Sequence, residues 1–270
     1  MKLILMGTND FVVPVFDSLA QKHDIIAVFT RAPKPVGRKH ILTPSPVNVW
    51  ADSRGLCVYT SIKEFDTITT KPDMIIVFSY GVILRDNVLN AAPCINIHPS
   101  SLPKYRGPSP IRTAILNGDA DMDVCLMKMV SELDAGDILM RENIKIGIND
   151  NNESVEKKVS DTAIKMLDKY LTNPDAYTAI PQNGEPVFTR KFTGEDEIID
   201  WKHLPMQIHN QIRALGCGRT KINGIDVKIL ETRIENNELK ITKIQPSGKN
   251  PMDWKSFVNG LHGAEIRYGE

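Results

Sequence analysis

Residues 73–79 read DMIIVFS, and this stretch decides the fold class. An uninterrupted apolar run, without a polar residue at every second position, is typical of a strand covered on both faces of a parallel sheet. Similar runs occupy residues 2–6, 24–30, 94–98 and 124–129. Helical periodicity separates several of them, as in residues 10–22. The first part of the chain is therefore predicted to be α/β, a Rossmann-like, mostly parallel sheet with helices on both faces.

The remainder of the chain has a different pattern. Residues 151–171 have helical periodicity, and turn residues follow them. A second helix is predicted over residues 205–215, and three short strands follow it. The predicted strands are residues 219–222, 226–233 and 239–245, the first two joined by Asn223-Gly224, which is a strong hairpin signal. We predict two domains, residues 1–184 and residues 185–270, the second a small, reduced, β-rich domain of OB-like type.

Charge and composition exclude several classes of protein. The chain has 270 residues, with 33 Lys and Arg against 33 Asp and Glu, so an overall basic coat for nucleic acid is absent. Its longest apolar runs are far shorter than the roughly 18 residues that span a bilayer. The four cysteines show no C-x-x-C spacing, so neither a disulfide framework nor a metal site is expected. We read no export signal, and we expect a cytoplasmic protein without membrane contact.

The strongest chemical signal lies at the end of one predicted strand. Asn96 and His98 are two residues apart, so both side chains project from the same face. Pro99 ends the strand, which places an amide donor and a titratable imidazole where α/β sheets bind their ligands. The alternative is structural, with Asn96 capping a turn and His98 filling a core position.

A carboxylate follows in a glycine-containing loop. Asp134 precedes Gly136, and a strand is expected after Asp137. Asp134 could orient the His98 ring and stabilise its charged form. Asp137 could do the same by its chemistry alone, and both could instead be turn-forming residues.

These motifs resemble those of a known family. The string N-x-H-x-S-x-L-P-x-Y-R-G over residues 96–107, followed by LDAGDIL over residues 133–139, is similar to the 10-formyltetrahydrofolate-dependent formyltransferases. Further segments resemble the methionyl-tRNA formyltransferase branch: residues 7–11, 35–38, 43–47, 79–84, 108–111, 199–201, 212–215 and 245–249. The resemblance covers most of the chain.

The resemblance implies an activity, and the chemistry of the residues agrees with it. An amine would attack the formyl carbon of 10-formyltetrahydrofolate, and the developing oxyanion needs donors such as Asn96 and protonated His98. The implied catalytic residues are Asn96, His98 and Asp134, and no metal is required. The implied folate-binding residues are Tyr80, Gly81, Val82, Leu84, Ser100, Ser101, Leu102 and Pro103. The implied acceptor is the amino group of methionyl initiator tRNA, and we expect a monomer.

A basic segment is the candidate contact for tRNA. Residues 31–40 carry four basic residues and no acidic one: Arg31, Lys34, Arg38 and Lys39. A solvated charged loop is the ordinary meaning of such a run. Its prolines and Gly37 indicate an ordered projecting loop of the kind that contacts phosphates.

Other functions remain open on the sequence. The nearest is an N-formyltransferase acting on an amino-sugar nucleotide; the others are a hydrolase that releases formate from the folate and a non-enzymatic binding protein. Two positions depart from the family pattern. Residues 122–125 read MDVC where the family has Thr-Gly-Val-Thr, and Ser101 stands where an apolar residue is common. We expect the first departure to lower efficiency and the second to loosen the folate pocket.

Overall fold

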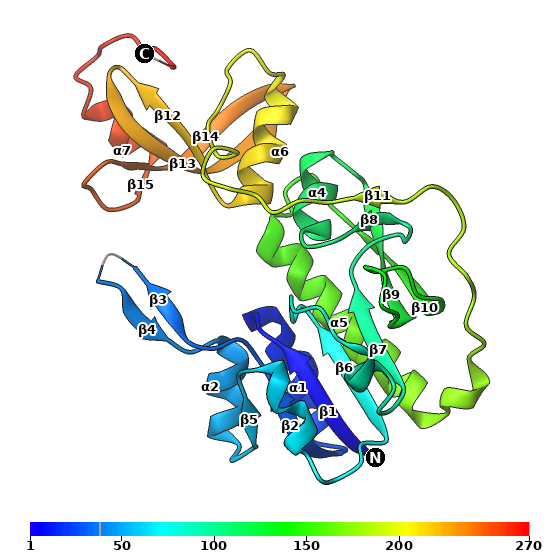
Figure 1. Ribbon diagram of the computed structural model, residues 1–270. Helices are drawn as coiled ribbons and strands as arrows, with labels where there is room; N and C mark the ends of the chain where they lie inside the picture. Colours follow the sequence, from blue (N-terminus) through cyan, green and yellow to red (C-terminus); the bar gives the residue numbers. More distant parts are fainter. Residues whose placement is uncertain (38, 270) are drawn as a thin grey trace. The chain divides into compact units, whose positions relative to one another are not determined.

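The computed structural model describes residues 1–37 and 39–269, and its largest sheet has seven strands (Figure 1). In spatial order the strands are β10 (Ile138–Lys145), β9 (Asp121–Lys128), β7 (Cys94–His98), β6 (Met74–Phe78), β1 (Lys2–Gly7), β2 (Asp24–Phe29) and β5 (Val58–Tyr59). From β7 to β5 every neighbouring pair is parallel. The Rossmann-like, mostly parallel sheet predicted from the sequence is confirmed.

One strand differs from that prediction in direction. The apolar run at residues 124–129 forms most of β9, which pairs with β7 in antiparallel register, His98 opposite Cys125. Residues 99–120, which contain β8 (Lys104–Arg106) and α4 (Pro110–Leu116), do not return the chain to the amino ends of the strands. The next strand therefore starts from the carboxyl end of β7 and runs the opposite way.

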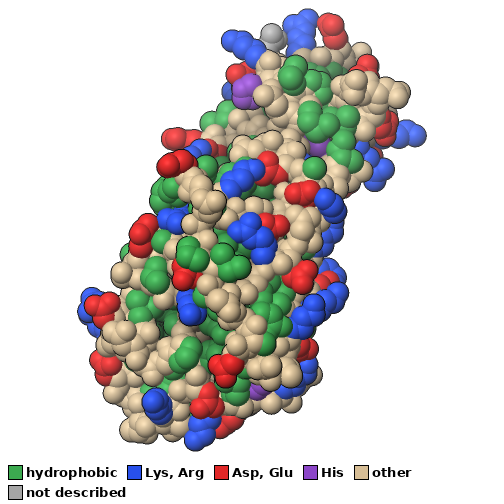
Figure 2. Space-filling view, turned by 90° about the vertical axis from the view of Figure 1, so that its right-hand side faces the viewer, with side chains coloured by type: hydrophobic (Ala, Val, Ile, Leu, Met, Phe, Trp, Pro, Cys, Tyr) green, Lys and Arg blue, Asp and Glu red, His purple; other side chains and the backbone are tan. Residues whose placement is uncertain are grey.

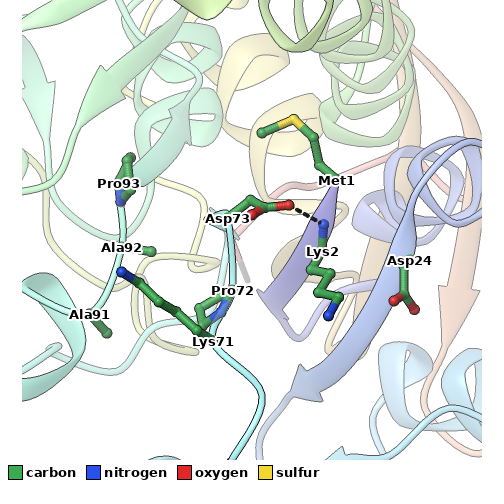
Figure 3. Close-up of a pocket in the computed structure, with 9 residues that line it drawn as sticks. All are labelled: Met1, Lys2, Asp24, Lys71, Pro72, Asp73, Ala91, Ala92 and Pro93. Atoms are coloured by element: carbon green, nitrogen blue, oxygen red, sulfur yellow. Dashed lines mark hydrogen bonds between the residues drawn. The ribbon is translucent and has the colours of Figure 1, made fainter.

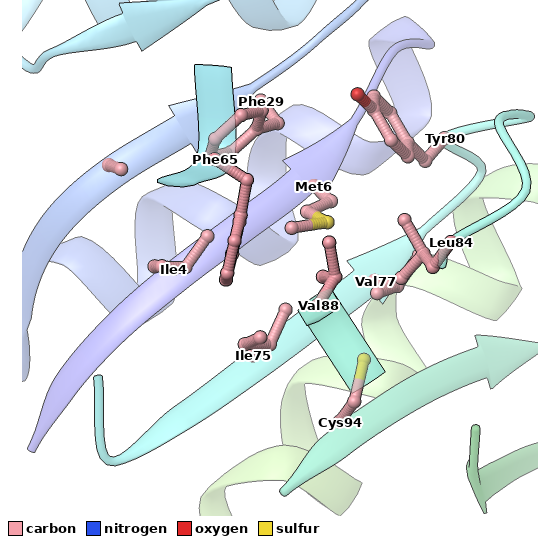
Figure 4. Close-up of a cluster of buried hydrophobic side chains, with 11 residues drawn as sticks. Ile4, Met6, Phe29, Phe65, Ile75, Val77, Tyr80, Leu84, Val88 and Cys94 are labelled. Atoms are coloured by element: carbon pink, nitrogen blue, oxygen red, sulfur yellow. The ribbon is translucent and has the colours of Figure 1, made fainter. Parts of the chain in front are cut away.

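The core lies against the central strands. All five residues of β6 are buried, as expected of a strand covered on both faces. On one side Met6, Phe29 and Ile75 pack together with Phe65 of the 3-10 helix η2 (Ile62–Thr67) (Figure 4). The same cluster includes Tyr80 and Leu84, so the core extends into the loop that follows β6.

Helices accompany this sheet. Besides η2, those that precede β7 in the chain are η1 (Asp10–Val12), α1 (Val13–Ala20), α2 (Pro46–Ser53) and α3 (Asp86–Leu89). The predicted long helix is α5 (Asn152–Thr172), which buries Val159, Ala163 and Met166 on one side. Its Ser160 hydroxyl donates to the carbonyl of Phe11, which holds α5 against η1.

The basic segment forms an element that periodicity did not predict. β3 (Lys34–Val36) and β4 (Ile41–Thr43) pair as an antiparallel hairpin, and all six residues are exposed. In Figure 1 this hairpin projects from the rest of the sheet-bearing unit. Arg38, between the two strands, lies outside the described residues.

The chain divides into two compact units that are interleaved along the sequence. One comprises residues 1–107, 123–144 and 156–188; the other comprises residues 108–122, 145–155 and 189–270. The predicted domain boundary between residues 184 and 185 stays a prediction.

The second unit contains the predicted β-rich tail. Four antiparallel strands, β12 (Gly218–Ile222), β13 (Ile225–Glu235), β14 (Glu238–Pro246) and β15 (Met252–Asp253), follow α6 (Pro205–Leu215) and precede α7 (Trp254–Asn259). Asn223 and Gly224 join β12 to β13 with φ of +47° and +75°, as a hairpin turn of this sequence requires. Ile212, Ile229 and Ile244 form its core. The small antiparallel tail is confirmed, with β15 as a fourth strand that the sequence did not predict.

Within residues 1–37 and 39–269, no helix combines the length and the apolarity that crossing a membrane needs. In the same residues no group of three or more His, Cys, Asp or Glu side chains is placed to hold a metal ion.

Candidate active site

The carboxyl ends of β1 and β6 meet at the point where the strand order reverses, which is where open α/β sheets bind ligands. Gly7 ends β1 where the backbone is closely packed, since a Cβ there would lie 2.8 Å from both the Phe16 ring and the Phe78 carbonyl. The loops after the two strands are joined: Asn9 Nδ2 donates to Ser79 Oγ at 2.7 Å. This rigid junction borders the candidate site.

β7 presents the predicted amide and imidazole together. Asn96 is 8% exposed and His98 4% exposed, and both project from the face shared by alternate residues of the strand. Nε2 of His98 lies 2.9 Å from the carbonyl oxygen of Tyr105. A carbonyl only accepts, so Nε2 carries a hydrogen and donates it.

The carboxylate that faces this ring belongs to Asp134. Its Oδ2 lies 3.6 Å from His98 Nδ1, and its Oδ1 lies 3.5 Å from Asn96 Nδ2. The backbone amide of Gly107 donates to Oδ2 at 2.7 Å. Asp134 itself has φ of +47°, a conformation that few residues other than glycine adopt. The structure thus brings Asn96, His98 and Asp134 together, and the carboxylate that it places beside the His98 ring is that of Asp134.

This arrangement is suited to moving a proton. Because Nε2 donates to Tyr105, a proton gained or lost by His98 is at Nδ1, on the side of Asp134. Asn96 supplies a neutral donor beside it. The two nearby cysteines offer no competing nucleophile, because burial raises the pKa of Cys94 to about 12 and that of Cys125 to about 11.

The loop after β7 is held by residues of β9 and β10. Ser100 is fully buried, its carbonyl accepts from Cys125 Sγ, and its Oγ has no partner among the described residues. Ser101 Oγ accepts from the Asp123 amide at 3.1 Å, and Arg141 donates to the Leu102 carbonyl at 2.7 Å. The two departures from the family pattern, Ser101 and residues 122–125, are therefore bonded to each other.

The second predicted folate-binding segment follows β6. Tyr80 and Leu84 are buried in the core, and burial raises the pKa of the Tyr80 hydroxyl to about 12. Val82 and Ile83 are exposed, Ile83 by 80%. Gly81 has φ of +69°, and its carbonyl accepts from Arg31 Nη2 at 2.6 Å.

The bond from Arg31 to the Gly81 carbonyl distinguishes Arg31 from the other three basic residues predicted to contact tRNA. Arg31 lies against Gly81 and holds the loop after β6, whereas Lys34 and Lys39 are exposed on the β3–β4 hairpin. The prediction for Arg38 falls outside the described residues.

A cavity of about 710 Å³ lies away from this site (Figure 3). It is lined by residues at the amino ends of β1, β2, β6 and β7, among them Lys2, Asp24, Lys71 and Asp73. Lys2 donates its backbone amide to Asp73 at 2.7 Å. The chemistry-bearing residues lie at the opposite, carboxyl ends of these strands.

Comparison with known proteins identifies the family. The model described as "Formyl transferase" matches residues 1–171, and that described as "Formyl transferase, C-terminal domain" matches residues 191–240. The chain belongs to the formyltransferase family. It is an enzyme of formyl transfer, as the sequence motifs indicated.

Curated relatives of this formyltransferase match it over nearly their whole length. A methionyl-tRNA formyltransferase of Listeria monocytogenes serotype 4a is 36% identical over 312 aligned positions, which cover 100% of this chain and 99% of the relative. One from Macrococcus caseolyticus is 34% identical over 297 positions, covering 96% and 95%. The first alignment is longer than this chain of 270 residues, so that relative has segments without a counterpart here.

Solved structures share the fold. A methionyl-tRNA formyltransferase from Clostridium thermocellum gives a TM-score of 0.65 at 16% identity, covering 91% of this chain and 98% of that one. An N-formyltransferase from Helicobacter canadensis, described in complex with folinic acid and dTDP-3-aminofucose, gives 0.68 at 21% identity, covering 87% and 88%. At these identities the likeness establishes the formyltransferase fold alone.

Proposed function

We propose that this formyltransferase transfers the formyl group of 10-formyltetrahydrofolate to the amino group of methionyl initiator tRNA. One observation carries the proposal: Asn96, His98 and Asp134 converge in a chain that is 36% identical to a methionyl-tRNA formyltransferase over its full length. We further propose that the enzyme acts as a cytoplasmic monomer, and its chemistry requires no metal ion.

The formyl donor is proposed to bind between two loops. The loop after β6 supplies Tyr80, Gly81, Val82 and Leu84, and the loop after β7 supplies Ser100, Ser101, Leu102 and Pro103. Both loops follow neighbouring parallel strands, so they lie at the same edge of the sheet. The unpartnered Ser100 Oγ supports this assignment, because a buried hydroxyl ordinarily has a hydrogen-bond partner.

Each residue has a role in the proposed reaction. The amino group attacks the formyl carbon, and Asn96 Nδ2 donates to the oxyanion that develops there. The attacking nitrogen loses a proton and the departing folate nitrogen gains one. His98 exchanges protons through Nδ1, and Asp134 stabilises the charged ring during this exchange.

Local basic groups are proposed to hold the tRNA, because the chain as a whole is neutral. On the face drawn in Figure 2, Lys and Arg side chains stand among Asp and Glu side chains over most of the surface. The hairpin residues Lys34 and Lys39 form one candidate contact. In the tail, Arg219 of β12 and Lys228 of β13 are directly opposite each other and exposed. Like charges at such positions destabilise a sheet, which supports an anion-binding role for this pair.

The proposed division of labour follows the predicted domains. Residues 1–184 carry the donor site and the chemistry, and residues 185–270 contribute to tRNA binding. The loop of residues 31–40 positions the acceptor end.

Formyl transfer assays test the proposal. Purified protein with 10-formyltetrahydrofolate is given methionyl-tRNA, an amino-sugar nucleotide, or water alone. We expect formylmethionyl-tRNA to form, with no formylated sugar and little release of formate. Formylation of the sugar instead of the tRNA would establish the alternative function, and release of formate without transfer would establish the hydrolase.

A further inference from the structure

Gln182 is a half-buried residue in a segment that is otherwise largely exposed. The segment is attached to the sheet-bearing unit on either side of this residue. Before it, Ile180 exchanges two backbone hydrogen bonds with Ile138 of β10, at 2.8 and 2.9 Å. After it, β11 (Val187–Phe188) pairs with β8. Gln182 is therefore held at a fixed place between two backbone attachments.

Both the nitrogen and the oxygen of the Gln182 side-chain amide are hydrogen-bonded. Nε2 donates to the carbonyl oxygens of Asp134 and Gly136, at 2.7 and 2.9 Å. Oε1 accepts from Nε and Nη2 of Arg106, at 3.1 and 2.9 Å. Carbonyls only accept and a guanidinium only donates, so the amide fits in one orientation alone.

These bonds fix the turn that carries the Asp134 carboxylate. Asp134 has φ of +47°, and a Cβ at Gly136 would collide with the Lys128 carbonyl, so the turn is closely confined. Gln182 holds the carbonyls at both ends of this turn. Through Arg106 it also holds the residue before Gly107, whose amide donates to the Asp134 carboxylate. One amide thus supports both the backbone and the side chain of Asp134.

We propose that Gln182 is a positioning residue that, with Arg106, keeps the Asp134 carboxylate in place beside His98. The proposal for Gln182 depends on the proposed function in one respect only: formyl transfer to methionyl-tRNA is the reaction whose kcat is measured. Gln182 touches neither His98 nor Asn96 by any of these bonds, so its effect passes through Asp134.

Two substitutions and one control separate positioning from general stability. Gln182→Met keeps the length of the side chain and removes every hydrogen bond. Gln182→Glu keeps the acceptor for Arg106 and removes the donors to Asp134 and Gly136. Gln211 is the matched control, because its Nε2 also donates to two carbonyls, those of Asp196 and Ile198, at 2.7 and 2.9 Å. Gln211→Met removes an equivalent brace far from this turn in the sequence.

We expect both Gln182 variants to lower kcat by about 10- to 100-fold, the size of effect that small misplacement of a reacting group produces. The KM for the folate should change by less than about threefold, and Gln211→Met should leave kcat within about twofold. In an Asp134→Ala background, Gln182→Met should cost nothing further in kcat, because residues that act as a unit are not additive. A full additional loss in that background, or normal kcat in the single variants, would overturn the proposal.

A readout without turnover keeps this inference separate from the proposed function. The Gly107 amide should exchange slowly with solvent deuterium in the unmodified protein and faster in both Gln182 variants, with no change in Gln211→Met. If the enzyme formylates another amine, kcat of the same single and double variants is measured with that acceptor. Unchanged Gly107 exchange in Gln182→Met would refute the positioning role whatever the acceptor is.

Discussion

Oδ2 of Asp134 lies 3.6 Å from Nδ1 of His98, although the loop and the strand that carry them are 36 residues apart in sequence. The opposite ring nitrogen is 2.9 Å from the Tyr105 carbonyl. The ring is thus fixed on one side by a backbone group, while the other side faces a carboxylate. A proton carried at Nδ1 therefore lies on the side of the Asp134 carboxylate.

Removing either member of this pair should lower turnover. We expect His98→Ala and Asp134→Ala each to reduce kcat by at least about 10²-fold, the ordinary contribution of acid–base catalysis. Single-turnover kinetics measure the loss, and circular dichroism checks the fold. Near-normal turnover of a folded Asp134→Ala protein would remove that residue from the mechanism.

Asn96 should act through its amide hydrogen. Asn96→Ala is expected to lower kcat by about 10²- to 10³-fold, the cost of one oxyanion donor. Asn96→Asp preserves the size of the side chain but places a negative charge beside the developing one, so we expect a loss at least as large. If Asn96→Asp were as active as the unmodified enzyme, the side chain would not contact the oxyanion.

The basic side chains within residues 31–39 should fall into two groups, according to the substrate whose binding they affect. Arg31→Ala should raise the KM for folate, because this variant cannot donate to the Gly81 carbonyl. Lys34→Ala with Lys39→Ala should instead weaken tRNA binding and reduce its dependence on salt, by about one unit of slope for each phosphate that the variant no longer neutralises. Filter binding at several salt concentrations measures the second effect. Equal damage to both substrates by the lysine variants would indicate a structural role for the hairpin.

Substitution of Arg219 and Lys228 should affect tRNA binding and the stability of the sheet in opposite ways. Replacing Arg219 and Lys228 by Thr removes two like charges that face each other across β12 and β13. We expect the melting temperature to stay the same or rise, while the affinity for tRNA falls. A lower melting temperature with unchanged affinity would show that the pair serves the sheet.

The second unit should lose stability in acid through His209. This ring is 2% exposed, its Nε2 donates to the Ile148 carbonyl, and its Nδ1 accepts from Thr232 Oγ1. Burial lowers the pKa of His209 from 6.5. The unfolded chain therefore takes up a proton near pH 6.5 that the folded chain does not, so the free energy of unfolding falls as the pH decreases below that value.

Urea unfolding at pH 7.5 and pH 5.5 measures this effect. His209→Gln retains a donor and an acceptor without a titrating ring, so the difference between the two pH values should become smaller. An undiminished difference in that variant would assign the acid sensitivity to other groups.

Local sequence patterns specified much of this fold. The strand Cys94–His98 and the helix Pro205–Leu215 have the bounds that the sequence predicted, because Pro99 ends the strand, while Pro205 and Gly216, at φ +85°, delimit the helix. Three features had no local signal. One is the hairpin of β3 and β4, whose six residues are all exposed and so show no alternation of buried and exposed positions. Another is the direction of β9, which depends on the edge of the sheet at which residues 99–120 end. Gln182 lies in a turn-rich stretch, and only contacts 46 to 76 residues away give it a role.

The interleaving of the two units has a consequence for synthesis on the ribosome. α4 buries Ile111, Ala114 and Ile115 and packs against α6 within the second unit, yet α6 begins only at Pro205. Because a chain emerges from its amino end, α4 is exposed as a nascent apolar helix until α6 has been translated. The tail therefore packs against a helix, α4, that is encoded well ahead of it, and it completes its fold only with that earlier segment of the chain.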